Sequence, residues 1–429
     1  MNRHLIAILI AVLCGIDIPA VSASPTVRLQ HTLPSPPRRG GRFGQSVAIN
    51  TESAFVGYRF DSTQILGGGS VSIFDLQSGA AVSVIDPVSP EVYGQFHNVA
   101  ANRGTLFIGA GGRWAGRDDP TGSAYLFDPT SGTLIRELQP PSDTIIFSNG
   151  LHSQHAVDGN YLATFGFDIT GIDDILTHDM LFPKVGLLYD LTTGEHVATF
   201  EPRGSAYRFG ASVVVHDDSV LIGSTNGTTT NGTADLFDAA TGQYLHSFQV
   251  QGSGFDGYRF GKATALNDEY ALIGTPGDDD FGGSSGSAYL FDAQTGQQLA
   301  KWTASDGRRG ALFGEAVAMN DRFAVIGAPA GASGQETLGG QAYVFDLSSG
   351  QEIAILSPDN NRIYSRFGES IAIEGNKIVI GASGLSQAFV YEIIPEPTTV
   401  TMLILTVLSV FGDNTRLSRR NGSDLSARN

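Results

Sequence analysis

Residues 288–300 read Ala-Tyr-Leu-Phe-Asp-Ala-Gln-Thr-Gly-Gln-Gln-Leu-Ala, and this stretch decides the fold. An apolar run leads into an aromatic residue and Asp292, and a second run comes after Gly296. An Asp at the head of a turn can accept hydrogen bonds from the backbone N–H groups two and three residues on, and a Gly can take the positive φ that the returning chain needs. The stretch therefore predicts a β-hairpin.

The same corner, an aromatic residue, Asp, two variable residues, Ser or Thr, and Gly, occurs six times. Its copies begin at Asp75, Asp128, Asp190, Asp238, Asp292 and Asp346. Subtracting successive numbers gives intervals of 53, 62, 48, 54 and 54 residues, which mark a repeat protein. Each repeat also contains four short apolar segments separated by turns. Each is therefore predicted to form one four-stranded antiparallel sheet.

The two ends of the repeat region complement each other. The last repeat ends near Glu392 without a corner or a fourth segment, whereas residues 27–33, with Pro34 directly after them, have the pattern of a fourth strand. We therefore predict an all-β protein whose residues 24–394 form a seven-bladed β-propeller of four-stranded antiparallel blades, with the last blade closed by the N-terminal strand. A closed ring leaves no long free edge. A solenoid of open sheets is the alternative, and it would need capping repeats that the sequence does not show.

Two further patterns recur along the body. Phe-Gly opens the first apolar segment of five repeats, and Gly-Ala-Pro or a variant closes the second, as at residues 327–329. The Phe-Gly pairs begin at Phe43, Phe209, Phe260, Phe313 and Phe367. Both patterns resemble the FG-GAP repeats that build the β-propeller of integrin α chains and of many bacterial surface proteins. The resemblance covers most of residues 27–394 and is weaker in repeats two and three, where Leu151 and His152 stand at one Phe-Gly position.

Composition excludes several classes of function. The chain has 429 residues and a formal net charge of −17, which argues against nucleic acid or anionic lipid as a partner because a phosphate backbone needs a basic face. Its single cysteine, Cys14, lies in the N-terminal apolar stretch. The mature chain is therefore expected to contain no disulfide and no cysteine-based zinc site.

Residues 1–23 have the features of a secretory signal peptide. Arg3 precedes an apolar stretch, and the segment ends in Val-Ser-Ala, which predicts cleavage after Ala23. A buried strand or a permanent anchor is the alternative. The apolar run of residues 5–14 is short for a bilayer, and Asp17 would interrupt any extension of it.

The C-terminal residues 395–429 combine three features in order: a Pro-Glu-Pro motif, an apolar run and a basic cluster. The motif is Pro395, Glu396 and Pro397, and the cluster is Arg416, Arg419 and Arg420. An apolar run with cations after it has the logic of a stop-transfer segment, so at least transient membrane contact is expected. This order resembles the PEP-CTERM sorting signal of surface-exported bacterial proteins, which implies processing by an exosortase-type peptidase and a final location at the cell surface or outside the cell. An unprocessed single-span anchor is the alternative.

A binding site is expected on one rim of the propeller. Short turns join first to second and third to fourth strands and so share one rim, whereas the longer, variable loops share the other. The longest insertion, residues 167–184, carries acids beside apolar residues and is the predicted contact loop. Its candidate binding residues are Asp168, Asp173, Asp174, His178 and Asp179. The alternative is a loop packed on its own blade.

Asp278, Asp279 and Asp280 stand where some FG-GAP blades carry calcium loops. Calcium prefers carboxylates that alternate along a turn, with a further acid several residues on, whereas Gly and Ser come next here. Calcium is therefore a candidate cofactor with a partial ligand set, and solvated acids are the alternative. No other cofactor is indicated.

Other chemical patterns are weaker. His97, His152 and His155 fall on inner strands, but a spacing of three places the last two on opposite faces of a strand, so packing or channel-polar roles are predicted. Residues 282–286 fit G-x-S-x-G but lie in a loop before a strand, whereas a nucleophile elbow needs a strand before it and a helix after it. An Arg precedes Phe-Gly in four repeats and is predicted to pair with acids of a neighbouring blade: Arg42, Arg208, Arg259 and Arg366.

These patterns lead to a functional hypothesis of a non-enzymatic, exported binding or adhesion module that presents its loop-rich rim to a surface protein or polysaccharide. The first alternative is a propeller enzyme, quinoprotein-like or carbohydrate-active. Only Trp114 and Trp302 could stack on a cofactor or sugar, and no repeated carboxylate pair is evident. The second alternative is a purely structural envelope protein.

Overall fold

The computed structural model describes most of the repeat region. The described residues are 25–36, 41–59, 69–86, 95–111, 123–141, 145–147, 155–168, 184–203, 209–225, 232–250, 259–329, 339–359 and 363–394. Residues 28–392 form one compact unit. The described part of the chain consists of strands and turns, and it contains no helix of the length and hydrophobicity that a bilayer crossing requires.

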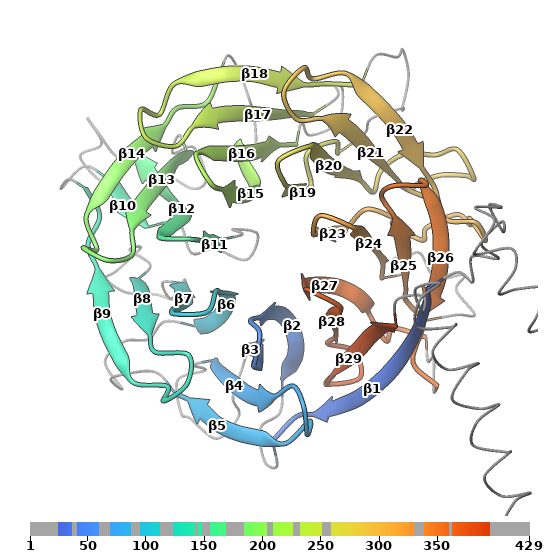
Figure 1. The fold of residues 1–429 in the computed structure, drawn as a ribbon, viewed down its shortest axis with the longest axis horizontal. Coiled ribbons are helices and arrows are strands. Elements are labelled where there is room, and N and C mark those ends of the chain that lie inside the picture. The colour runs from blue at the N-terminus through green and yellow to red at the C-terminus, as the bar shows by residue number, and fades with distance from the viewer. Residues whose placement is uncertain are drawn as a thin grey trace, which may run out of the picture. The chain divides into compact units, whose positions relative to one another are not determined.

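Seven antiparallel sheets succeed one another around a ring (Figure 1). Blade 1 contains β2 (Arg42–Ile49), β3 (Ser53–Arg59), β4 (Ser70–Asp75) and β5 (Ala81–Ile85). Blade 2 contains β6 (Gln95–Ala101), β7 (Leu106–Gly111), β8 (Ser123–Phe127) and β9 (Leu134–Leu138). Blade 3 contains β10 (Ile145–Phe147), β11 (Ala156–Asp158), β12 (Tyr161–Asp168), β13 (Lys184–Asp190) and β14 (His196–Phe200).

The remaining blades have the same order. Blade 4 contains β15 (Phe209–His216), β16 (Ser219–Ser224), β17 (Thr233–Asp238) and β18 (Tyr244–Phe248). Blade 5 contains β19 (Ala263–Leu266), β20 (Tyr270–Thr275), β21 (Ser287–Asp292) and β22 (Gln298–Trp302). Blade 6 contains β23 (Ala316–Met319), β24 (Phe323–Ala328), β25 (Gln341–Asp346) and β26 (Gln351–Leu356). Blade 7 contains β27 (Phe367–Glu374), β28 (Lys377–Ala382), β29 (Gln387–Ile394) and β1 (Thr26–Pro34).

The N-terminal strand closes the ring. Blade 7 has the strand order β1-β29-β28-β27, so the first strand of the chain lies beside the last one. This confirms the predicted fold class and the predicted origin of the missing fourth strand. Because β1 pairs with β29, the last blade has its fourth strand and the ring is closed.

Blade 3 departs from the regular pattern. Its inner strand is in two pieces, because β10 pairs with residues 166–168 and β11 pairs with residues 161–163 of β12. Blade 3 thus keeps the predicted four-stranded plan, with its first strand divided between β10 and β11. It is the repeat in which Leu151 and His152, which lie outside the described residues, replace Phe-Gly.

The Asp corners, meaning the six turns that begin at Asp75, Asp128, Asp190, Asp238, Asp292 and Asp346, are built as predicted. Asp292 Oδ1 accepts hydrogen bonds from the N–H groups of Gln294 and Thr295, at 3.1 and 2.7 Å. Gly296 has a φ of 72° and donates its N–H to the Asp292 carbonyl. The same bond to the residue three on occurs in the other five corners. Each corner is thus fixed by its own sequence, before any packing between blades.

Glycines explain the Phe-Gly and Gly-Ala-Pro patterns. A Cβ on Gly274, at the end of β20, would lie 2.0 Å from the carbonyl oxygen of Gly314 in the next blade. Gly314 itself has a φ of 88°, and a Cβ there would lie 2.4 Å from the Ser287 carbonyl oxygen of blade 5. We call this backbone contact the glycine seam. Equivalent contacts are Gly223 with Gly261, Gly327 with Gly368, and Gly381 with Gly44.

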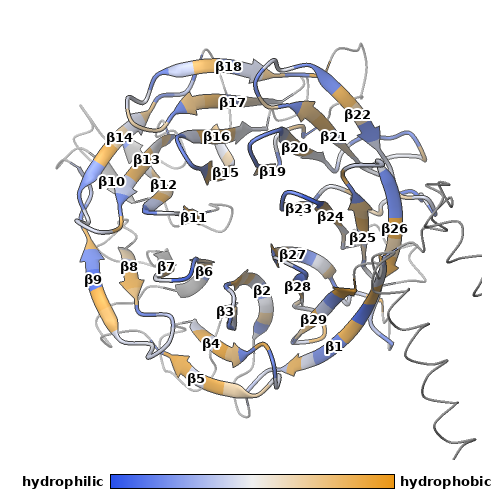
Figure 2. Cartoon of the chain, in the orientation of Figure 1, coloured by the Kyte–Doolittle hydropathy of each residue, from blue (hydrophilic) through white to orange (hydrophobic). Residues whose placement is uncertain are grey.

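The hydrophobic core lies between neighbouring blades. One cluster joins Leu272 and Trp302 of blade 5 to Ile326 and Tyr343 of blade 6, and others join blades 1 and 2, 2 and 3, 3 and 4, 4 and 5, and 7 and 1. Third strands such as β17 and β21 are largely buried, whereas outer strands such as β18 and β22 begin with two exposed residues. Both kinds of strand contain apolar and polar residues (Figure 2). Each blade is therefore stabilised mainly by burying its two faces against its neighbours.

Six outer strands share a β-bulge after the Asp corner. In each case the third strand skips one residue of the outer strand, and the skipped residue is apolar. These residues are Val82, Ile135, Val197, Leu245, Leu299 and Ile353. Exposure of the first five ranges from 36% at Val197 to 56% at Val82.

Candidate functional site

The rim that carries the turns between first and second strands, together with the Asp corners, is called the short-turn rim. In four blades the first strand ends in an Asn whose side chain accepts hydrogen bonds from its own turn and donates one to the next blade. Asn320, for example, accepts from the N–H groups of Arg322 and Phe323 and donates to the Gly375 carbonyl at 2.7 Å. The other three are Asn50, Asn102 and Asn267. These side chains connect neighbouring blades around this rim.

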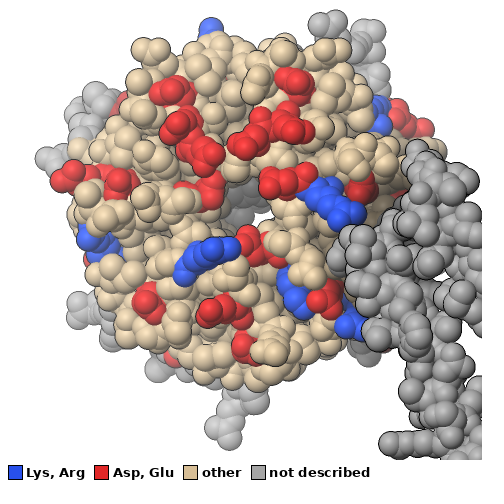
Figure 3. Space-filling model, viewed as in Figure 1, with Lys and Arg blue, Asp and Glu red and all other residues tan. Residues whose placement is uncertain are grey.

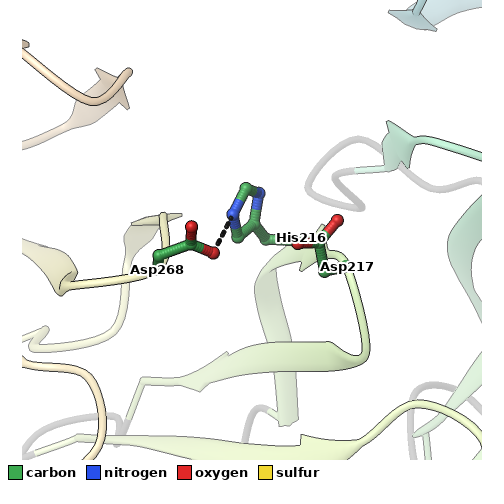
Figure 4. Close-up of side chains that lie close together, drawn as sticks. All are labelled: His216, Asp217 and Asp268. Atoms are coloured by element: carbon green, nitrogen blue, oxygen red, sulfur yellow. Dashed lines mark hydrogen bonds and ion pairs between the residues drawn. The ribbon is translucent and has the colours of Figure 1, made fainter.

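His216 occupies the same position in blade 4. Its Nδ1 lies 3.2 Å from Asp158 Oδ2 of blade 3, and its Nε2 lies 3.1 Å from Asp268 Oδ1 of blade 5. The Asp217 backbone N–H also donates to Asp158 Oδ2. Figure 4 shows the imidazole directed toward Asp268, with Asp217 on its own turn. One side chain thus connects three consecutive blades.

The electrostatics of this cluster favour a charged imidazole. Hydrogen bonding to Asp158 raises the pKa of His216 to about 9, and the second bond to Asp268 acts in the same direction against partial burial. The hydrogen bond to His216 in turn lowers the pKa of Asp158. At neutral pH the cluster is an imidazolium between two carboxylates, which is a stable inter-blade ion pair.

His216, Asp217 and Asp268 also have the spacing of a metal site, and within the described ranges theirs is the one such group. A metal would have to compete with a proton on either ring nitrogen, because both nitrogens already face carboxylates. No motif or composition pattern in the sequence pointed to this cluster. Alignment of the repeats would have shown it, because His216 stands where four other blades carry Asn.

Acidic side chains dominate the short-turn rim. Figure 3 shows them gathered around the central opening, most densely over blades 4 and 5. The turns between first and second strands carry eight acids against three Arg or Lys side chains. The acids are Glu52, Asp158, Asp217, Asp218, Asp268, Glu269, Asp321 and Glu374, and the bases are Arg103, Arg322 and Lys377. Such a surface attracts cations and repels anions.

The opposite rim, called the loop-rich rim, is described in blade 5. Asp278 is completely buried there, and its Oδ2 accepts hydrogen bonds from the Tyr289 hydroxyl at 2.8 Å and from Lys301 Nζ at 3.0 Å. Lys301 Nζ also lies 2.7 Å from Asp280 Oδ2. Burial alone would lower the pKa of Lys301, but the bonds to Asp280 and Asp278 raise it above its ordinary value. The amine is therefore fully charged at neutral pH.

This arrangement bears on the predicted calcium loop. Two of the three candidate carboxylates, Asp278 and Asp280, converge on the Lys301 ammonium, while Asp279 is exposed and donates its N–H to Asp278 Oδ1. Lys301 thus supplies positive charge at the point where the two carboxylates meet. The sequence did not reveal Lys301, which lies opposite Tyr289 on the outer strand. Calcium binding here remains a prediction.

The same loop forms a rigid platform with the connection between blades 5 and 6. The N–H groups of Gly310, Leu312 and Phe313 donate to the carbonyls of residues 283–285, at 3.0–3.1 Å. Phe281 projects from the loop with 51% of its surface exposed, and its ring lies against the backbone of Gly307. Residues 282–286 belong to this loop and precede β21, as predicted for a G-x-S-x-G match without a nucleophile.

The predicted contact loop is described at its two ends. Asp168 ends β12 and is partly buried, whereas Asp173, Asp174, His178 and Asp179 lie outside the described residues. Lys184 starts β13 and donates to the Gly210 carbonyl of blade 4 at 2.6 Å, with its Nζ 4.3 Å from the Phe165 ring centroid. Burial lowers the pKa of Lys184 to about 7.

Charged residues also line the inner strands near the loop-rich rim. Arg259 and Lys262 of blade 5 pair with Glu315 of blade 6, at 3.5 and 3.2 Å. Arg366 pairs with Glu369 of its own blade at 3.3 Å. The predicted pairing of Arg with a neighbouring blade is therefore confirmed for Arg259 and wrong for Arg366, whose acid lies three residues on in the same blade.

The remaining predictions on site residues have mixed outcomes. His155 Nδ1 lies 2.8 Å from Thr164 Oγ1 and its ring packs on Phe107, which agrees with the predicted packing role. The side chains of His97 and His152 lie outside the described part of the chain, as do Ala23 and the C-terminal motif and basic cluster. Signal peptide, sorting signal and membrane contact therefore stay predictions.

Part of the chain matches a known family model, and two solved structures align with most of it. Residues 253–291 and 297–345 match the family model of the FG-GAP repeat. Among solved structures, BamB from Moraxella catarrhalis aligns with a TM-score of 0.44 and 13% identity, over 87% of this chain and 100% of that chain. The β-propeller domain of the Trilobed protease from Pyrococcus furiosus aligns with a TM-score of 0.49 and 10% identity, over 85% of this chain and 94% of that chain. No curated protein matches the sequence. The chain thus carries FG-GAP repeats within a seven-bladed β-propeller.

Proposed function

We propose that this protein is an exported, non-enzymatic binding module that engages a surface protein or polysaccharide through its loop-rich rim. The observation that carries the proposal is the exposed Phe281 on a backbone platform fixed by hydrogen bonds from the blade 5–6 connection. A rigid aromatic side chain held out from a β scaffold contributes contact area at low entropic cost.

A second group of exposed apolar residues also favours the loop-rich rim as the binding surface. Ile363 and Tyr364, on the connection between blades 6 and 7, are 47% and 63% exposed. Tyr364 also has a φ of 68°, a left-handed conformation that is uncommon for an aromatic residue. Apart from Ile394, the other exposed large apolar residues in the described ranges lie on outer strands. The described loop-rich rim therefore displays aromatic residues on fixed backbone, as binding surfaces do.

The geometry offers less support for an enzyme. Burial raises the pKa of Asp235 and of Glu369, but Asp235 is in blade 4 and Glu369 is in blade 7. An acid–base pair needs two such groups within reach of one substrate. Trp302, one of two candidates for stacking on a cofactor, is buried and stacks on Phe345 with ring centroids 4.6 Å apart.

The proposed export rests on the two termini. The predicted signal peptide would direct the chain to secretion, and the C-terminal motif would direct it to the cell surface or beyond.

Immobilised full-length protein, incubated with surface proteins and glycans of its own host, tests the proposal. We expect specific retention that falls at least fivefold when Phe281→Ser and Tyr364→Ser are combined. Leu245→Ser is the matched control, since Leu245 is 49% exposed on an outer strand. Replacing residues 169–183 by a short Gly-Ser linker tests the contact loop, and a chelator tests calcium. Absence of retention, or equal retention by the Leu245 control and the double variant, would reject the loop-rich rim as the binding surface.

A further inference from the structure

A cavity of about 540 Å³ opens on the short-turn rim between blades 1 and 2. Blade 1 contributes Glu52, Asp75, Ile73 and Val82, and blade 2 contributes Arg103 from its own first turn. Its volume falls in the range of sites that hold a small molecule or a single inserted side chain. The cavity lies at the other end of the blades from the loop-rich rim.

The outer strand beside this cavity carries a short side chain. At two boundaries an outer-strand side chain crosses to the next Asp corner. Arg136 donates to the Thr193 carbonyl, and His31 contacts the Gln77 carbonyl at 3.1 Å. The residue of blade 1 that corresponds to Arg136 is Ser83, whose side chain is too short to reach as far as Arg136 does.

The charges of the cavity are fixed by its turns. The Glu52 backbone is held in place, because its N–H donates to Asn50 Oδ1 and its carbonyl accepts from Leu76. Hydrogen bonds from the Ser78 hydroxyl and N–H lower the pKa of Asp75, so that this carboxylate is ionised at neutral pH. Two carboxylates against the one guanidinium of Arg103 leave the cavity with a net negative charge.

The walls of the cavity add an apolar component. Val82, the bulged residue of β5, is 56% exposed, and Ile73 lies beneath it with 1% exposure. Carboxylates above an aliphatic wall match a long cationic side chain, whose stem packs on carbon while its charged end reaches the acids. The surrounding acidic rim would draw such a group toward the cavity.

We propose that this cavity binds a lysine or arginine side chain presented by a partner protein. The stem packs against Val82, and the cation lies between Glu52 and Asp75. Arg103 forms the opposite wall and excludes a second cation. This is a contact on the rim opposite to the one that carries the proposed function, so either proposal can fail without the other.

Binding of Nα-acetyl-arginine N-methylamide to the purified full-length protein tests the proposal, with the matching citrulline compound as the uncharged control. Calorimetry at low salt is expected to show saturable one-to-one binding of the arginine probe and none of the citrulline probe. Glu52→Gln should weaken that binding by about fivefold, the upper range for one exposed charge pair. Glu269→Gln, at the same turn position in blade 5, should leave it unchanged.

Filling the cavity provides a second test. Val82→Arg places a guanidinium beside Glu52 and Asp75 and should abolish binding of the probe, whereas Leu245→Arg, at the equivalent bulge of blade 4, should not. Equal binding of both probes, no saturable binding by wild type, or equal weakening by Glu52→Gln and Glu269→Gln would overturn the proposal. The last result would mean that the acidic rim attracts cations without a defined site.

Discussion

The two ends of a blade boundary are held together in different ways. Near the loop-rich rim, the glycine seam brings backbone against backbone, as where Gly274 meets the Gly314 carbonyl. On the short-turn rim, side chains such as Asn320 cross from one turn to the next. A backbone contact leaves no space for a Cβ, whereas a side-chain bridge can be built from several residue types. The seam is therefore uniform in sequence and the bridges vary.

The boundary between blades 3 and 4 carries a cation at each of its two ends. At its short-turn end, His216 and Asp158 replace the Asn bridge with an ion pair. At its other end, Lys184 donates to the Gly210 carbonyl, which is a neutral acceptor. The surroundings shift the two pKa values in opposite directions, up to about 9 for His216 and down to about 7 for Lys184. Acids stabilise one cation, while burial destabilises the other.

The largest effect is expected at the glycine seam. Gly274→Ala would place a Cβ 2.0 Å from the Gly314 carbonyl oxygen, so the two blades must separate. We expect a loss of about 3 kcal/mol or more in the free energy of unfolding, measured by urea denaturation. Gly104→Ala is the control, because a Cβ there has no neighbour within 4 Å. Similar stabilities of the two variants would show that the seam can relax.

Removing a side-chain bridge should lower the free energy of unfolding by less than Gly274→Ala does. Asn320→Ala loses two bonds within its turn and one to blade 7, and we expect a loss of about 2 kcal/mol. Asp321→Ala, at the exposed neighbouring position, should change stability by less than about 0.5 kcal/mol. If Asn320→Ala matched Gly274→Ala, the distinction between the two ends of the boundary would disappear.

Removing the ion pair between His216 and Asp158 should change the free energy of unfolding by an amount that depends on pH. The folded pKa of His216 is about 9 and its ordinary value is 6.5, so its stabilising contribution is complete below pH 6.5 and is lost as pH rises through 9. His216→Asn is expected to cost about 1 kcal/mol at pH 6 and almost nothing at pH 9.5. Urea midpoints at pH 6, 7.5 and 9.5 measure the change. A stability difference between wild type and His216→Asn that does not vary with pH would contradict the ion pair.

The smallest effect, with the opposite sign, is expected for Lys184→Met. Burial lowers the folded pKa of Lys184 to about 7 from 10.5, so the protonated amine destabilises the fold below pH 7, and this penalty fades as pH rises toward 10.5. The variant should be more stable than wild type at pH 6, by about 1 kcal/mol or less, because the bond to Gly210 is lost as well. The gain should disappear by pH 9.5. A variant less stable than wild type at pH 6 would rule out a penalty from the charged amine.

Local chemistry explains what the sequence could predict. The Asp corner needs only Asp292 and Gly296 in one turn, and the missing fourth strand of the last repeat pointed to residues 27–33. The contact of Lys301 with Asp278 depends on which residues of β21 and β22 face each other, and the bulge at Leu299 shifts that register by one. Counting alternate residues from the corner therefore places Lys301 incorrectly.

The bridges and loops were harder to predict for other reasons. Asn50 and its counterparts resemble ordinary turn residues until the repeats are superposed, and only then does His216 stand out. The variable loops carry no period, so their composition suggested a site without indicating its geometry. Tyr364, with its left-handed backbone, gave no signal at all, because such a conformation is imposed by the surrounding structure.

The bulges of the outer strands have a consequence for the protein at high concentration. A propeller protects its short inner edges around the central opening but presents one outer strand per blade around its perimeter, and each outer strand is a template on which another chain could form a sheet. At Val82, Ile135, Val197, Leu245, Leu299 and Ile353, the unpaired residue twists that strand and interrupts its ladder. Neighbouring molecules can therefore crowd side by side without exchanging strands, and the perimeter resists aggregation although it exposes apolar side chains.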